Sequence, residues 1–364
     1  MIIIKSFMKK HINTPVRSGR RKSPVSAWIL AVCLCLSACA LRPADGSGSA
    51  ASGSAVSASA SASAASSPAV SGIDTSAADS VSAEEKAGVG SAADGTLSSV
   101  RARAAQIGAR YGIRILCGSE ARLSYSDYTA SALREPDRVL PALEVIERTL
   151  DIYPPGFFTS VREGFCDSIT ICLARNLHAV NDDSHLESAH AFTTVQDDTI
   201  WLVLNAEEPV LPSTLIHELT HVTDYRLLAM HQLLESEWGR LNPQDFNYYN
   251  AYLDESGRDL RLTGSRRYTA EEETDPQEIW FYDAYSRTYA MEDRARLMEK
   301  LLETVPGGAP QSPADPLPDR DLCFASPHVR TKLRFYFYTL RQAFGTSRWP
   351  DQTSWEAALQ EIAE

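Results

Sequence analysis

Two histidines one helical turn apart, His217 and His221, are the residues of this chain best suited to sharing a metal ion. The spacing His-x-x-x-His places both imidazoles on one face of a helix. Glu218 directly follows the first histidine, where a carboxylate can reach a water molecule on the metal without displacing a ligand. The segment therefore predicts a zinc (Zn2+) site at which Glu218 is the general base for hydrolysis.

The residues around this motif favour a helix. Pro212 and Ser213 form a start at which the Ser213 hydroxyl can cap free backbone N–H groups. An apolar stripe predicts the face that packs inward, and it consists of Leu215, Ile216, Leu219 and Val222. The alternative is a chance match to H-E-x-x-H within an ordinary amphipathic helix.

A catalytic zinc site needs a third protein ligand and one open position. A second predicted helix, which runs to Leu302, carries Glu292 near its start. Glu292 is the first candidate for the third ligand. Alternatively, Glu292 is an exposed acid paired with Arg296 at i,i+4, and Asp293 or Glu299 is the ligand.

Glu292 and Ala295 together resemble the E-x-x-A pattern of gluzincins, the peptidases in which H-E-x-x-H is completed by a glutamate ligand. In that branch the small residue lets the two helices pack closely. No H-x-x-G-x-x-H extension of the metzincin type follows Glu218. The resemblance implies a zinc peptidase with ligands His217, His221 and Glu292.

A longer motif, H-E-x-x-H-x-x-D, ends at Asp224 and resembles the anthrax lethal-factor-like and Pro-Pro endopeptidase group. That group places a tyrosine seven residues before the ligand glutamate, and Tyr285 holds this position relative to Glu292. The resemblance implies that Tyr285 donates a hydrogen bond to the reaction's oxyanion, with Tyr289 as the alternative. Asp224 would accept a hydrogen bond from a ligand histidine. This resemblance covers only motifs within residues 212–300. The chain also resembles zinc-binding metallopeptidase lipoproteins of bacteria.

The N-terminus predicts export. A basic segment precedes an apolar run over residues 25–38, which is short for a membrane span because a span needs about 20 residues. Leu36-Ser37-Ala38-Cys39 resembles the lipobox of bacterial lipoproteins. This resemblance implies cleavage before Cys39 and a lipid anchor that holds the protein on the outer face of the cell membrane. The alternatives are an ordinary signal peptide with an incidental cysteine, and a true start at Met8.

Charge and composition divide the chain into three parts. The signal, residues 1–39, holds no acidic residue, so all 47 Asp and Glu of this 364-residue chain follow it. The acidic part of the chain that follows residue 39 is therefore unsuited to binding nucleic acid. Residues 40–97 are dominated by Ala, Ser and Gly and predict a disordered linker. Residues 98–364 then form the predicted zinc peptidase domain.

The periodicity of this domain predicts an α+β fold, with a small sheet packed beside the metal-bearing helix and a mostly helical C-terminal half. Strands are predicted over 113–117, 168–173, 191–195 and 199–204, the last two as a hairpin. Helices are predicted over 98–111, 137–151, from 212 through the motif, and over 229–240, 277–303 and 328–344. Thr353 and Glu356 predict a capping box at the start of a last helix.

Cysteine and histidine usage leaves two questions open. Disulfides are allowed in an exported domain, and four cysteines permit three pairings; they are Cys117, Cys166, Cys172 and Cys323. His178, His185 and His190 precede the hairpin, and their irregular spacing favours surface positions over a second metal site.

The hypothesis from the sequence is a cell-surface zinc peptidase that acts on protein or peptide substrates. Two other classes remain: a surface protein that binds zinc or peptide without turnover, and a cell-wall zinc amidase. The base at Glu218 favours an enzyme, because a site that only binds metal needs no carboxylate there.

Overall fold

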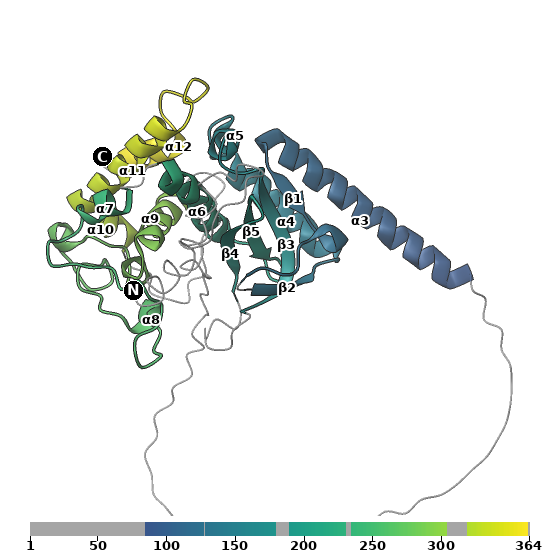
Figure 1. The fold of residues 1–364 in the computed structure, drawn as a ribbon, viewed down its shortest axis with the longest axis horizontal. Helices are drawn as coiled ribbons and strands as arrows, with labels where there is room; N and C mark the ends of the chain where they lie inside the picture. Colours follow the sequence, from purple (N-terminus) through teal and green to yellow (C-terminus); the bar gives the residue numbers. More distant parts are fainter. Residues whose placement is uncertain (1–83, 127, 180–188, 231–233, 304–318, 363–364) are drawn as a thin grey trace, which may run out of the picture.

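The computed structural model describes residues 84–126, 128–179, 189–230, 234–303 and 319–362, with side chains from Thr96 onward (Figure 1). The predicted export signal, Cys39 and the linker as far as residue 83 lie outside these residues. Within the described ranges, no helix is both long and apolar enough to cross a membrane.

A five-stranded mixed sheet forms the N-terminal part of the domain. Its central strands run parallel in the order β1-β3-β5, while β4 pairs antiparallel with β5 and β2 antiparallel with β3. The strands are β1 (Arg114–Leu116), β2 (Tyr128–Ala132), β3 (Ser168–Ala179), β4 (Ala191–Gln196) and β5 (Thr199–Asn205).

The predicted hairpin is confirmed. Gln196 of β4 pairs with Thr199 of β5, so Asp197 and Asp198 alone form the turn. Both aspartates adopt φ of 54°, the left-handed conformation that two-residue hairpin turns require and that Asp tolerates. Strand β2 was not predicted, because its short, polar segment is held only by pairing with the distant β3.

Side chains of β3 alternate between two buried layers, as strand geometry requires. Ile169, Ile171 and Leu173 face the main core, whereas Cys172 and Ala174 face a smaller cluster on the other side of the sheet. Because both faces are covered, residues 169–174 of this strand are all fully buried.

The helices pack beside the sheet and make up the C-terminal half, which confirms the α+β prediction (Figure 1). Motif helix α6 contacts β4 and β5 and also packs along α9. The helices are α3 (Glu84–Tyr111), α4 (Pro136–Leu150), α5 (Phe157–Arg162), α6 (Pro212–Met230), α7 (Leu234–Gly239), α8 (Leu260–Thr263), α9 (Ala290–Leu302), α10 (Arg320–Ala325), α11 (Pro327–Ala343) and α12 (Ser354–Glu361); short 3-10 turns are Gly118–Glu120, Pro276–Glu278 and Tyr285–Arg287.

Two helix boundaries differ from the prediction. Helix α3 begins at Glu84, inside the predicted linker, where Ala, Glu and Lys are good helix formers. The continuous helix predicted over 277–303 is wrong, because α9 begins only at Ala290. Before it, the Asp283 carboxylate accepts hydrogen bonds from the backbone N–H and the hydroxyl of Ser286, which stabilises a turn instead of a helix.

The four domain cysteines carry free thiols, and all except Cys166 are buried. Burial raises the pKa of the half-buried Cys166 thiol to about 11, which keeps it protonated at neutral pH.

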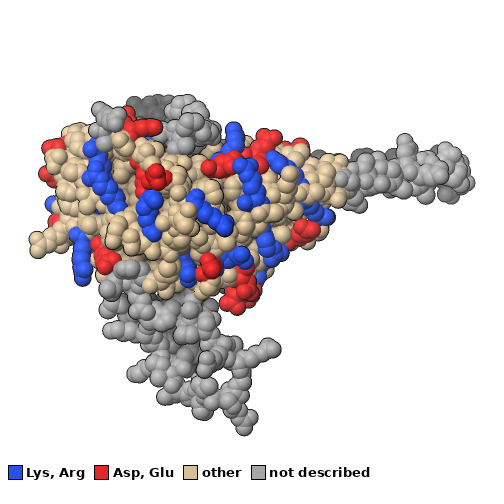
Figure 2. Space-filling model, turned by 90° about the horizontal axis from the view of Figure 1, so that it is seen from above, with Lys and Arg blue, Asp and Glu red and all other residues tan. Residues whose placement is uncertain are grey.

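Lys and Arg side chains are interspersed with Asp and Glu on the face shown in Figure 2. Exposed ion pairs such as Arg110–Asp151, with 2.7 Å between nitrogen and oxygen, contribute at most about 1 kcal/mol each. The charged groups buried around α9 matter more, because they surround the candidate site.

Candidate metal centre

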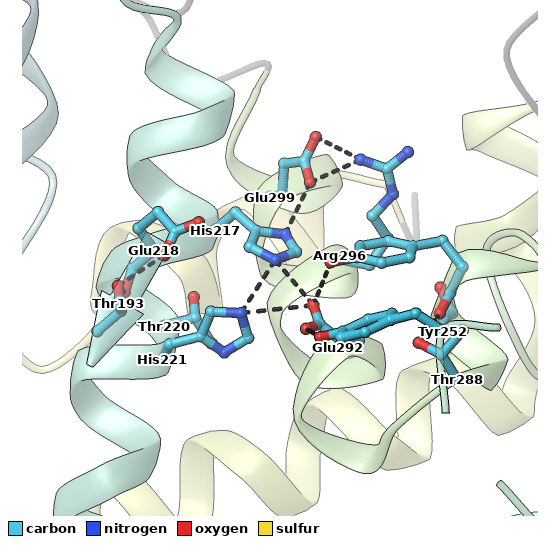
Figure 3. A network of polar contacts seen from close by, with 12 residues as sticks. Thr193, His217, Glu218, Thr220, His221, Tyr252, Thr288, Glu292, Arg296 and Glu299 are labelled. Atoms are coloured by element: carbon cyan, nitrogen blue, oxygen red, sulfur yellow. Dashed lines mark hydrogen bonds and ion pairs between the residues drawn. The ribbon is translucent and has the colours of Figure 1, made fainter. Parts of the chain in front are cut away.

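Three side chains from α6 and α9 converge on one point. The Nε2 atoms of His217 and His221 lie 3.1 Å apart. Oε2 of Glu292 lies 3.0 Å from the first of these nitrogens and 3.4 Å from the second. Figure 3 shows both rings directed from α6 toward this carboxylate on α9. All three side chains are at most 5% exposed.

The donor set fits a zinc ion. Tetrahedral bonds of about 2.0–2.2 Å place neighbouring ligand atoms roughly 3.3–3.6 Å apart, close to the separations observed. Two imidazole nitrogens and one carboxylate oxygen are also ligands that zinc accepts. In the described part of the chain this is the one group of three such side chains. His185 of the alternative histidine cluster lies outside that part.

Close packing of α6 and α9 brings the ligands together. Every residue of α9 is buried, and Ala295, the small residue one turn after Glu292, is 0% exposed. Glu292 is therefore not the exposed acid of the alternative interpretation. Asp293 points elsewhere, because its Oδ2 accepts hydrogen bonds from Trp238 and Lys332.

Charge complementarity keeps the Glu292 carboxylate ionised. Burial opposes ionisation, but His221 and His217 provide positive charge and hydrogen bonds, so the pKa of Glu292 lies well below its usual range. A buried carboxylate that stays ionised beside two imidazoles is suited to a divalent cation.

Glu299 takes a supporting position instead of the ligand position considered for it in the sequence. Its Oε2 lies 3.1 Å from Nδ1 of His217, the ring nitrogen remote from the ligand cluster. Arg296 and Lys300 contact the same carboxylate, at 2.9 and 3.0 Å. Burial opposes ionisation of Glu299, yet these two cations hold its pKa below the usual range.

Two phenols contact the ligand carboxylate. Tyr285 donates a hydrogen bond to Oε2 of Glu292 over 2.7 Å, and its ring lies nearly parallel to that of His217. Tyr252 donates to Oε1 of the same carboxylate over 2.5 Å. Tyr289 packs edge-on against Tyr252, with 4.9 Å between the ring centroids. Nothing in the local sequence pattern around Tyr252 marks this residue as part of the site.

Glu218 lies on the other side of the histidines from Glu292 and is turned toward Thr193 (Figure 3). Strand β4 brings this threonine to α6, where its hydroxyl donates a hydrogen bond to Oε2 of Glu218 over 2.6 Å. Both residues are buried. Thr193 was missed in the sequence, because only the packing of β4 on α6 connects the two.

Asp224 joins a buried network behind the site. Its carboxylate accepts hydrogen bonds from Nε of Arg294 at 2.6 Å and from the hydroxyl of Tyr336 at 2.8 Å. Burial raises the pKa of Asp224, while the charges of Arg294 and His221 oppose that shift. The expected hydrogen bond from a ligand histidine to Asp224 stays a prediction.

Comparison with known proteins finds one solved structure of low similarity. No protein-family model and no curated protein matches the chain. Among solved structures, the chain is similar to a candidate zinc-binding metallopeptidase from Bacteroides caccae ATCC 43185, with a TM-score of 0.40 and 12% identity over 78% of this chain and 93% of that one. Because this likeness is low, the function proposed below rests on the site itself.

Proposed function

We propose that the domain is a zinc-dependent peptidase that acts at the cell surface on protein or peptide substrates. The observation that carries the proposal is the convergence of His217, His221 and Glu292 at zinc-ligand spacing. Glu218 directly follows the first ligand on the same helix. Three protein ligands leave one position for water and substrate, as in catalytic zinc sites.

Zinc bound by these three residues would acidify a water molecule and polarise the substrate carbonyl. Glu218 is the base that removes the proton from the attacking water and then delivers it to the leaving amine. The hydrogen bond from Thr193 orients this carboxylate. Tyr285, whose phenol donates to Oε2 of Glu292 in this structure, would turn to donate a hydrogen bond to the oxyanion that develops on the carbonyl oxygen.

The position of β4 supports a peptide as the substrate. Among the described strands, β4 pairs only with β5 and therefore forms an edge of the sheet, next to α6. An extended peptide can add to such an edge through backbone hydrogen bonds. This placement would bring a scissile bond alongside the motif helix.

The decisive experiment compares the wild-type protein with Glu218→Gln, which keeps the size of the side chain and removes the base. We expect both proteins to hold about one zinc per chain. Only the wild type is expected to cleave members of a peptide library, with turnover of the variant lower by at least about 100-fold. Glu208→Gln, at an exposed position, is the matched control.

The outcomes separate the competing classes. Zinc binding without cleavage of any peptide would favour a binding protein, and release of fragments from cell-wall material alone would favour an amidase. A wild-type protein without affinity for zinc would contradict the proposal altogether.

The proposal of a surface location depends on Cys39, which we propose is acylated after signal cleavage. Cys39→Ser is expected to prevent incorporation of radiolabelled fatty acid and to release the protein from the membrane fraction. Equal membrane association of wild type and variant would contradict the lipid anchor.

A further inference from the structure

Each carboxylate oxygen of Glu292 accepts a hydrogen bond from a different tyrosine. Oε2 accepts the hydrogen bond of Tyr285, and Oε1 accepts that of Tyr252. The three rings of His217, Tyr285 and Tyr252 lie nearly parallel, with interplanar angles of 21° between neighbours. The two phenols therefore belong to one ring stack and differ in the carboxylate oxygen that they contact.

Only one of these oxygens belongs to the ligand cluster. Oε2 is the atom within 3.0 and 3.4 Å of the two histidine nitrogens. A metal ion at this point would take Oε2, so Tyr285 donates to the oxygen that the ion requires. Tyr252 holds Oε1, and its hydrogen bond is compatible with metal ligation by the other oxygen.

The backbone around Tyr252 is fixed at several points. Its carbonyl accepts a hydrogen bond from the N–H of Leu260 over 2.7 Å, and Leu253 forms a bridge with Asp259, which closes a small loop. Just before this loop, Asn250 donates its N–H to the carbonyl of Thr288 over 2.8 Å. The loop is therefore attached to the segment that leads into α9.

A cation–π contact with Arg261 also restrains the side chain of Tyr252. The guanidinium of Arg261 lies 5.6 Å from the ring centroid. Asp259 fixes this guanidinium by a two-pronged contact, with 2.8 Å from Nε to Oδ1 and 2.5 Å from Nη2 to Oδ2. A phenol restrained in this way can impose one orientation on a carboxylate.

We propose that Tyr252 is a positioning residue that acts through Glu292. It holds Oε1 so that Oε2 faces the two histidine nitrogens, where the metal ion would bind. The inference rests on the proposed zinc site. The two tyrosines, although they contact the same carboxylate, thus have separable effects: Tyr252 on metal affinity and Tyr285 on turnover.

The test measures zinc affinity by competition with a chromophoric chelator, and peptide turnover at saturating zinc, for single tyrosine-to-phenylalanine variants of the full chain. We expect Tyr252→Phe to weaken zinc binding by about tenfold or more. We expect Tyr285→Phe to keep zinc affinity within about threefold and to lose about 100-fold in turnover. Tyr338→Phe, at a residue 64% exposed on α11, is the control that should change neither quantity.

A double-mutant cycle distinguishes positioning from general destabilisation. If Tyr252 acts through Glu292, Tyr252→Phe should cost no further zinc affinity when it is added to Glu292→Gln. Electronic spectra of the cobalt-substituted proteins should shift for Tyr252→Phe and not for Tyr338→Phe. Unfolding temperatures of the metal-free forms show whether the variants are folded.

Two results would overturn the inference while leaving the zinc peptidase intact. One is wild-type zinc affinity in Tyr252→Phe, and the other is an equal, additive loss in the Glu292→Gln background. Absence of zinc binding by the wild-type protein would instead contradict the proposed function, so the two failures are distinguishable.

Discussion

Oε2 of Glu299 on α9 and Nδ1 of His217 on α6 lie 3.1 Å apart, and the contact joins the two helices that carry the ligands. Because the carboxylate is ionised, it can only accept a hydrogen bond, and Nδ1 must carry the hydrogen. In the neutral imidazole that a metal ligand must be, the lone pair is then on Nε2, the atom that faces Glu292. Glu299 therefore sets the tautomer that a metal ligand needs.

Glu299→Gln is expected to weaken zinc binding by about tenfold, because an amide stabilises this tautomer and orientation less well than a carboxylate. The change keeps the side-chain volume, and chelator competition measures the effect. Glu303→Gln is the matched control, since Glu303 contacts the same Lys300 at 2.9 Å from the next helical turn. Equal zinc affinity of the two variants would contradict this role for Glu299.

Lys332 and Asp293 form a buried ion pair between α11 and α9, with 2.8 Å between Nζ and Oδ2 and both side chains 0% exposed. Lys332→Met removes the cation and leaves a buried carboxylate, so we expect a loss of about 3–5 kcal/mol in the free energy of unfolding. Chemical denaturation measures it. Arg334→Met, at an exposed position of the same helix, should cost less than about 0.5 kcal/mol. Similar losses in both variants would show that the pair is not the cause.

Local patterns were sufficient to predict the elements that carry the ligands. His217 and His221 are related by helical spacing alone, and α6 forms where the apolar stripe predicts a helix. Glu292 was found because an acid and a small residue one turn apart stand on a second periodic helix. The hairpin of β4 and β5 was equally local, since its turn residues adjoin its strands.

The remaining site residues depend on contacts between distant segments. Thr193 reaches Glu218 from 25 positions away, and Tyr252 reaches Glu292 from 40 positions away. No periodicity in the sequence predicts these two contacts, because they depend on how β4 and the 250–264 segment pack on α6 and α9. The turn before α9 was missed for a related reason: a side-chain contact of Asp283 replaces the helical hydrogen bonds that the pattern predicts.

The capping box at the start of α12 provides a prediction of pH dependence. The backbone N–H of Thr353 donates to Glu356 over 2.7 Å, and Arg341 donates to the same carboxylate over 2.6 Å. Burial would raise the pKa of Glu356, but the contacts with Arg341 and Thr353 outweigh it and lower the pKa. In the acidic range below the ordinary glutamate pKa, the unfolded chain then binds this proton more readily than the folded protein does.

Because the folded pKa is the lower one, the contribution of Glu356 to stability is fully present at neutral pH and is lost as the pH falls through that folded pKa. Glu356→Gln is therefore expected to lower the free energy of unfolding by about 1–2 kcal/mol at pH 7, since it replaces charged hydrogen bonds by neutral ones. The difference from wild type should shrink steadily as the pH falls below the ordinary glutamate range, measured by urea unfolding at a series of pH values. Glu361→Gln, at an exposed position of the same helix, should follow the wild-type curve throughout. A difference for Glu356→Gln that stays constant with pH would mean that the loss comes from packing around Trp355 and not from the charge.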